Sequence, residues 1–74
     1  MKVKIRLGTL SDIKGFVSAA SKIVDAEVYL TDGNNLTVSA KSVLGAMYTM
    51  EWNDIYCTCD KDIYSTIRSF AADE

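Results

Sequence analysis

The 74-residue sequence contains no histidine and no proline. Without histidine, the chain lacks the commonest general base, the commonest metal ligand and any phosphohistidine chemistry. Its two cysteines, Cys57 and Cys59, are too few for a disulfide-stapled secreted domain, which usually carries four or more. They also lack the spacing of a redox pair and the further ligands that a zinc site needs. We therefore expect no metal and no cofactor.

Basic residues are outnumbered, with 8 lysines and arginines against 10 acidic residues. A nucleic-acid partner is not expected, since such binders usually carry a strong positive charge. No run approaches the roughly 20 apolar residues of a membrane helix, so we expect no membrane partner. The N-terminal MKVKIRLG alternates charge with hydrophobe instead of forming a signal peptide, which predicts a cytoplasmic protein. No nucleophile has an evident base and no cofactor loop is present, so we expect no enzyme.

Apolar residues make up 49% of the chain, enough for a folded domain. At this length we expect one domain, residues 1–74, with a thin core. Alternation over 2–7 predicts a strand with Val3 and Ile5 inside and lysines outside. Helical spacing predicts a helix over about 11–24, begun by Ser11 and Asp12, with an apolar stripe formed by Ile13, Phe16, Val17, Ala20, Ile23 and Val24.

The rest of the chain predicts a hairpin, a short helix, a strand and a last helix. Turn residues at 31–35 separate two alternating segments, so 27–40 predicts a β-hairpin. Its core face comprises Val28, Leu30, Leu36, Val38 and Ala40. Ser42 opens a short helix over about 43–48, residues 53–59 form a fourth strand, and Asp60 begins a last helix whose end, 72–74, frays. The apolar stripe of that helix comprises Ile63, Ile67, Phe70 and Ala71.

This order predicts an α+β open-faced sandwich, with a four-stranded antiparallel sheet and three helices on one face. A ferredoxin-like domain is the alternative, because it shares most of the element order and differs in strand order. Cations and hydroxyl or phenol groups should line the other, wet face of the sheet. They are Lys2, Lys4, Arg6, Tyr29, Thr37, Tyr56 and Thr58.

Residues 40–47, AKSVLGAM, resemble the segment that opens the second helix of HPr, the phosphocarrier protein of the bacterial sugar phosphotransferase system. Phe16-Val17 and residues 36–40 are similar to the family pattern as well. The resemblance places Thr9 where the family has its phosphorylated histidine, with Ser11 and Asp12 at the following arginine and proline positions. It therefore implies an HPr-like protein without a histidine relay and with no catalytic residue.

The same resemblance makes Ser42 a candidate for regulatory phosphorylation, because the matching serine of Gram-positive members is a kinase substrate. The alternative is that Ser42 is only a helix N-cap, for which serine is among the best residues. Val43, Leu44 and Met47 are candidate partner-binding residues, although a short helix must bury something, and we expect one or two of them to enter the core. Lys14 keeps one positive charge on the face that meets acidic partners in the family.

Two functional hypotheses follow. The first is a regulatory or protein-binding module that docks on a protein of the HPr-binding type through the Ser42 helix. The second is a small structural domain, unrelated to sugar transport, that forms homodimers through an apolar patch or a strand edge.

Overall fold

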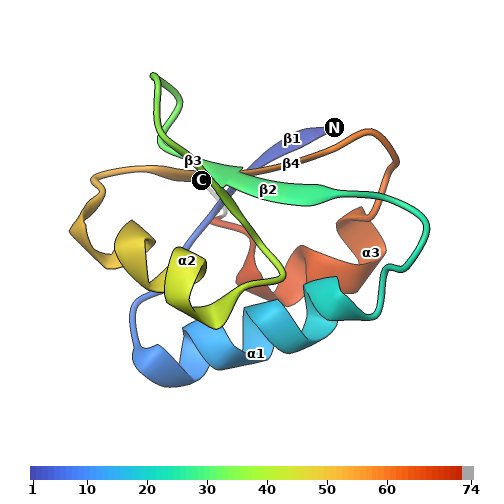
Figure 1. The fold of residues 1–74 in the computed structure, drawn as a ribbon, viewed down its shortest axis with the longest axis horizontal. Helices are drawn as coiled ribbons and strands as arrows, with labels where there is room; N and C mark the ends of the chain where they lie inside the picture. The colour runs from blue at the N-terminus through green and yellow to red at the C-terminus, as the bar shows by residue number, and fades with distance from the viewer. Residues whose placement is uncertain (73–74) are drawn as a thin grey trace.

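The computed structural model describes residues 1–72 and forms one sheet with helices packed on one face (Figure 1). The α+β class with three helices on one sheet is therefore confirmed. No helix in the described part of the chain is long and apolar enough to cross a membrane. The elements are β1 (Lys2–Ile5), α1 (Leu10–Ser21), β2 (Val28–Thr31), β3 (Thr37–Ser39), α2 (Val43–Met47), the 3-10 helix η1 (Tyr48–Glu51), β4 (Ile55–Cys59), α3 (Tyr64–Ile67) and the 3-10 helix η2 (Arg68–Phe70).

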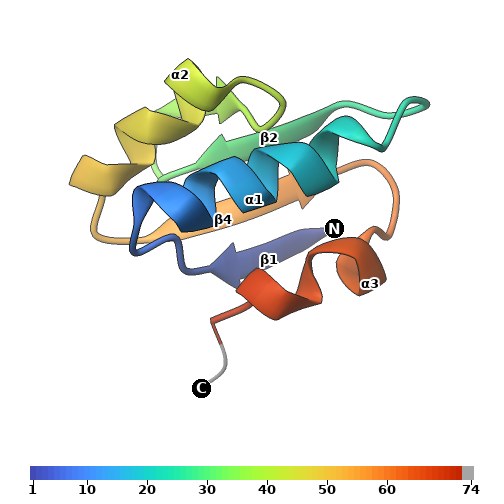
Figure 2. The same ribbon diagram turned by 90° about the horizontal axis from the view of Figure 1, so that it is seen from below.

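The sheet is antiparallel throughout, with the strand order β1-β4-β2-β3. Lys2 pairs with Thr58, and Val28 pairs with Cys59, so β4 lies between β1 and β2. In a ferredoxin-like domain the third strand, and not the fourth, lies between the first and second strands. The observed order therefore differs from the ferredoxin-like alternative and is compatible with an HPr-like sandwich. Figure 2 shows α1 across the middle of the sheet, with α3 on the β1 side and α2 on the β3 side.

The core lies between the sheet and α1. Phe16 is fully buried, and its ring meets Phe70 edge-on, with the centroids 5.2 Å apart. Along β4, side chains alternate between buried and half-buried, and the buried ones are Ile55, Cys57 and Cys59. Both cysteines are free thiols that act as small core hydrophobes, as the sequence predicts.

The opposite face of the sheet is wet, as the alternation predicts. Lys2, Lys4 and Tyr29 are exposed there, while Tyr56 is half-buried. The Lys2 ammonium lies 4.9 Å from the centroid of the Tyr56 ring, and Lys4 Nζ lies 3.1 Å from an oxygen of Asp54. This pairing with Asp54 raises the pKa of Lys4. The cations of β1 are thus held against the sheet.

The outer edge of β1 is closed by the segment that follows η2. The Arg6 N–H donates to Phe70 O at 2.9 Å, and the Ala72 N–H donates to Lys4 O at 2.9 Å. Ala71 forms an isolated bridge with Ile5. Our expectation that Ala72 frays is therefore wrong, because its backbone pairs with β1. The remainder of that predicted end, residues 73–74, lies outside the described residues.

Three element boundaries differ from the sequence expectation. Helix α1 starts at Leu10 and ends at Ser21, so Val24 lies beyond it and is 88% exposed. Leu36 precedes β3 and is 49% exposed, so its place on the core face of the hairpin was wrong. The last helix begins at Tyr64 instead of Asp60, since residues 60–63 form the turn that leaves β4.

Candidate functional site

Helix α2 begins where the sequence predicts, because Ser42 caps it. Ser42 has extended backbone dihedrals (φ −114°, ψ 120°), and its Oγ accepts a hydrogen bond from the Gly45 N–H at 3.1 Å. This bond satisfies one of the N–H groups that a helix start leaves without a partner. The Ser42 side chain is nevertheless exposed, so its hydroxyl can be reached from solvent.

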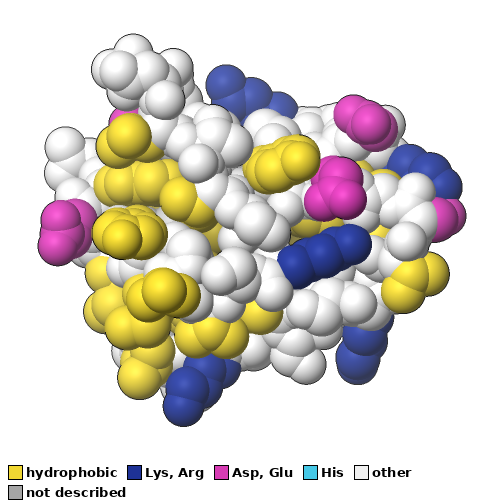
Figure 3. Space-filling model, viewed as in Figure 1, with side chains coloured by type: hydrophobic (Ala, Val, Ile, Leu, Met, Phe, Trp, Pro, Cys, Tyr) yellow, Lys and Arg dark blue, Asp and Glu magenta, His cyan; other side chains and the backbone are white. Residues whose placement is uncertain are grey.

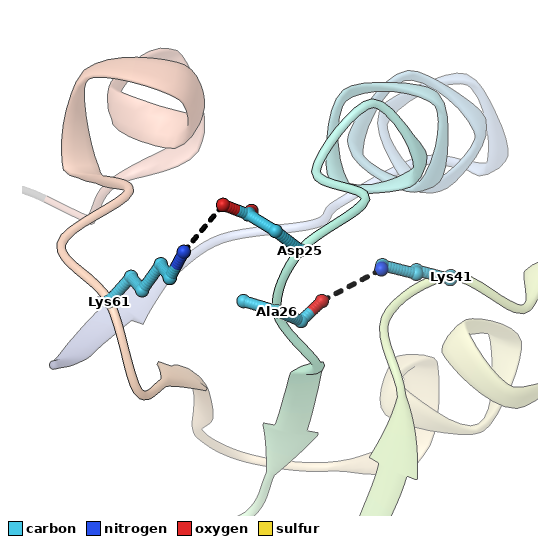
Figure 4. Close-up of polar contacts among 4 residues, drawn as sticks. All are labelled: Asp25, Ala26, Lys41 and Lys61. Atoms are coloured by element: carbon cyan, nitrogen blue, oxygen red, sulfur yellow. Dashed lines mark hydrogen bonds and ion pairs between the residues drawn. The ribbon is translucent and has the colours of Figure 1, made fainter.

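Lys41 fixes the segment that leads into α2. Its ammonium donates to Ala26 O at 2.8 Å, which ties this segment to the connection between α1 and β2 (Figure 4). Its backbone N–H donates to Ser39 Oγ at 3.2 Å. On the other side of the same connection, Lys61 forms an ion pair with Asp25, and this contact lowers the pKa of the Asp25 carboxyl. Lys41 therefore ties the segment before α2 to the α1–β2 connection, and Lys61 ties the same connection to the end of β4.

The candidate docking residues all face solvent. Val43 is 39% exposed, Leu44 is 70% exposed and Met47 is 40% exposed. Our expectation that one or two of them enter the core was wrong, because Ala46 is the buried residue of α2. An alanine suffices there since α2 packs closely on α1 and on the end of β3. The three side chains are therefore left on the surface.

Neighbouring side chains extend this surface along the chain. Tyr48 and Met50 of η1 are exposed as well, and Leu10 at the start of α1 is 43% exposed. Figure 3 shows hydrophobic side chains gathered on the side of the molecule where α2 and η1 lie. We call Val43, Leu44 and Met47, together with Tyr48 and Met50, the α2 patch.

The side chains at the start of α1 cap this helix. Thr9, which the resemblance places at the family's histidine position, is the N-cap of α1, and its Oγ1 accepts from the Asp12 N–H at 3.0 Å. In return, Asp12 Oδ2 accepts from the Gly8 N–H at 3.1 Å. This reciprocal arrangement resembles a capping box and corrects our expectation that Ser11 and Asp12 begin the helix. Lys14 is exposed on α1, as its proposed role requires.

Both cysteines are buried in the core. Cys57 is fully buried, and desolvation raises the pKa of its thiol to about 12, with the neighbouring Cys59 adding to the shift. Within residues 1–72, no three histidine, cysteine or carboxylate side chains come close enough together to hold a metal ion. The Cys57 thiol is therefore a packing group of the core.

A second feature was not found from the sequence. Leu36, Val38, Tyr48 and Trp52 line a hollow of about 250 Å³ beside β3, in which Thr37 also takes part. No periodic pattern links these residues, because they come from a turn, a strand and the two ends of η1. Leu36 and Val38 were assigned to the core face of the hairpin, and Tyr48 and Trp52 were considered only as an extension of the patch on the Ser42 helix.

Comparison with known proteins gives no relative: no family model matches the chain, and no curated protein and no solved structure matches it. The likeness to HPr thus rests on residues 40–47, on the element order and on the fold described above.

Proposed function

We propose that this chain is a protein-binding module of the HPr-like type that has no histidine relay and docks on a partner through the α2 patch. The observation that carries the proposal is the exposure of Leu44, which keeps 70% of its surface in water in the first turn of a short helix. Isolated exposed hydrophobes are ordinary, but a contiguous set marks an interaction surface. Burying a side chain of this size against a partner contributes about 1.5–3 kcal/mol.

The position of Ser42 supports a regulated contact. Its hydroxyl is exposed and directly precedes Val43, so a phosphate there would add nearly two negative charges at the edge of the α2 patch. An apolar partner surface would then have to cover a charged group, which is costly. Lys14 on the adjoining helix supplies a cation for an acidic rim on the partner. The resemblance to the phosphotransferase system implies a cytoplasmic partner of the HPr-binding type.

The test uses a Gram-positive HPr kinase, which is itself an HPr-binding protein. The folded chain is incubated with this kinase and ATP, and phosphate incorporation is followed by intact mass. We expect one phosphate on the wild type, none on Ser42→Ala and a rate lowered at least about tenfold by Leu44→Asp. Val24→Asp is the matched control, because it places the same charge on an 88% exposed residue beyond α1.

Two outcomes would reject the proposal. If the wild type gains no phosphate while circular dichroism shows it folded, Ser42 is a helix cap and the likeness to HPr is one of fold. If Leu44→Asp and Val24→Asp slow the reaction equally, the α2 patch is not the docking surface.

The exposed patch also supports the second candidate function, a homodimeric structural domain. In that case the average mass measured by light scattering would rise toward that of a dimer as the protein concentration increases. Leu44→Asp would return the mass to that of a monomer, while Val24→Asp would leave the dimer intact.

A further inference from the structure

The two edges of the sheet differ in what covers them. The β1 edge is occupied by residues 70–72, whose backbone groups bond to Lys4 and Arg6. Strand β3 forms the other edge, and among residues 1–72 no further strand pairs with it. An uncovered edge presents backbone groups to which another chain can pair.

The register of the hairpin identifies these backbone groups. Ala40 N–H donates to Val28 O at 2.9 Å, and Asp32 N–H donates to Leu36 O at 3.2 Å. In an antiparallel pair, hydrogen-bonded and non-bonded residue pairs alternate, so Val38 exchanges its bonds with Leu30. The N–H and C=O of Thr37 therefore point away from β2, as does the N–H of Ser39. The Ser39 carbonyl is already taken, since it accepts from the Ser42 N–H.

An apolar groove follows this open edge. The hollow of about 250 Å³ lined by Val38, Tyr48 and Trp52 continues past Leu36 into a second hollow of about 380 Å³. Leu36 and Trp52 line both hollows, so the two hollows adjoin at these residues, and we refer to them together as the groove. A side chain of an added strand would enter the first hollow, and a side chain two residues further along would reach the second.

The second hollow is acidic. Asp32, Glu51 and Asp54 line it, and no lysine or arginine does. Asp54 is partly neutralised by Lys4, whereas in the described part of the chain no cation lies within 4 Å of the Asp32 or Glu51 carboxylates. The half-buried Trp52 beside them offers a ring face that attracts a cation. The charge of the groove thus favours a lysine or arginine at this end.

We propose that the β3 edge and this groove bind an extended segment of another protein that carries an apolar residue followed, two positions later, by lysine or arginine. The segment adds a short strand to the sheet through Thr37 and Ser39, which is the strand-addition mode of peptide recognition. Its apolar side chain lies against Tyr48 and Trp52, and its cation lies among Asp32, Glu51 and Asp54. This surface shares Tyr48 with the α2 patch but does not include Leu44.

The test is a titration of ¹⁵N-labelled protein with two six-residue peptides, both acetylated and amidated, followed by NMR. One peptide is Thr-Leu-Thr-Lys-Thr-Lys and the other is Thr-Leu-Thr-Glu-Thr-Glu. We expect saturable shifts of the Thr37 and Ser39 amides and the Trp52 indole, and at least about fivefold tighter binding of the lysine peptide. Glu51→Lys should abolish this preference, whereas Asp60→Lys, an equal charge change at the far end of β4, should keep it. Leu44→Asp should bind both peptides as the wild type does.

Each of four results would overturn the proposal: no saturable shift with either peptide, equal affinity for both, equal effects of Glu51→Lys and Asp60→Lys, or shifts confined to the α2 patch. Shifts of the groove amides that grow with protein concentration in the absence of peptide would also overturn it. They would show that a second copy of the chain occupies the edge.

Discussion

Replacing Gly33 by alanine should destabilise the protein, and the turn between β2 and β3 explains why. Gly33 has φ +83°, a left-handed conformation in which an L-residue costs about 1–2 kcal/mol. An ideal Cβ at Gly33 would also lie 2.9 Å from Tyr56 Cε2, so the ring must move. That movement sacrifices the contact of the ring with the Lys2 ammonium, worth about 0.5–1 kcal/mol at an exposed site.

Alanine also restricts the unfolded chain, which offsets about 0.4–1 kcal/mol of this loss. The net destabilisation is therefore about 1–2 kcal/mol, equivalent to a fall in Tm of roughly 5–15 °C for a domain of this size. Thermal and urea unfolding followed by circular dichroism measure both quantities. Gly8→Ala is the matched control, because its φ is not positive and its Cβ would meet only Asp12 Oδ2, at 3.8 Å. Equal stability of Gly33→Ala and Gly8→Ala would refute the reasoning.

Two further predictions concern α1 and β4. Gly15→Ala should stabilise the fold by about 0.5–1 kcal/mol, because Gly15 lies within α1 and the added Cβ would make an ordinary 3.5 Å contact with Phe70. Urea unfolding measures this gain, and a loss of stability would show that the added Cβ does not fit against Phe70. The second prediction is alkaline destabilisation through Cys57, whose pKa is about 12 in the folded chain against an ordinary 9.0. Below pH 9 the thiol is protonated in both the folded and the unfolded chain, so burying it stabilises the fold fully. Between pH 9 and pH 12 only the unfolded chain ionises, and this stabilisation is lost. The stability advantage of the wild type over Cys57→Ala should therefore shrink by about 1–1.5 kcal/mol between pH 8 and pH 10. An advantage that is constant over this range would contradict burial of the thiol.

Strict alternation made the strands and the sheet faces predictable. Val3 and Ile5 alternate with lysines, and Ile55, Cys57 and Cys59 alternate with half-buried residues, so each strand has only one face that can enter the core. The start of α2 was predictable for a similarly local reason, since the Ser42 hydroxyl needs only the Gly45 N–H three residues away.

The end of α1 could not be predicted in this way. The apolar spacing runs on through Ile23 and Val24, and neither proline nor a positive-φ glycine interrupts it. The helix ends at Ser21 because the chain must turn to reach β2, and that turn is fixed by distant contacts of Ala26 and Asp25 with Lys41 and Lys61.

The candidate surfaces were predictable only in part. Leu44 could be named as a docking residue, but its exposure depends on how closely α2 packs on α1, which lets Ala46 alone fill the interface. The groove beside β3 could not be named at all. Its existence depends on the strand order, which leaves β3 at an edge, and on η1, which brings Trp52 beside Leu36.

The arrangement of β1 also affects the order in which the domain can assemble. Strand β1 is made before β4, yet Lys2 pairs with Thr58, and Arg6 bonds to Phe70. Contacts so distant along the chain slow folding, because a long loop must close before they form. During synthesis β1 therefore waits without a partner, while α1 and the β2–β3 hairpin, whose contacts are local, are free to form. Lys2 and Lys4 of β1, with Arg6 directly after it, keep this unpaired segment in solution, which gives these cations a role before the native sheet exists.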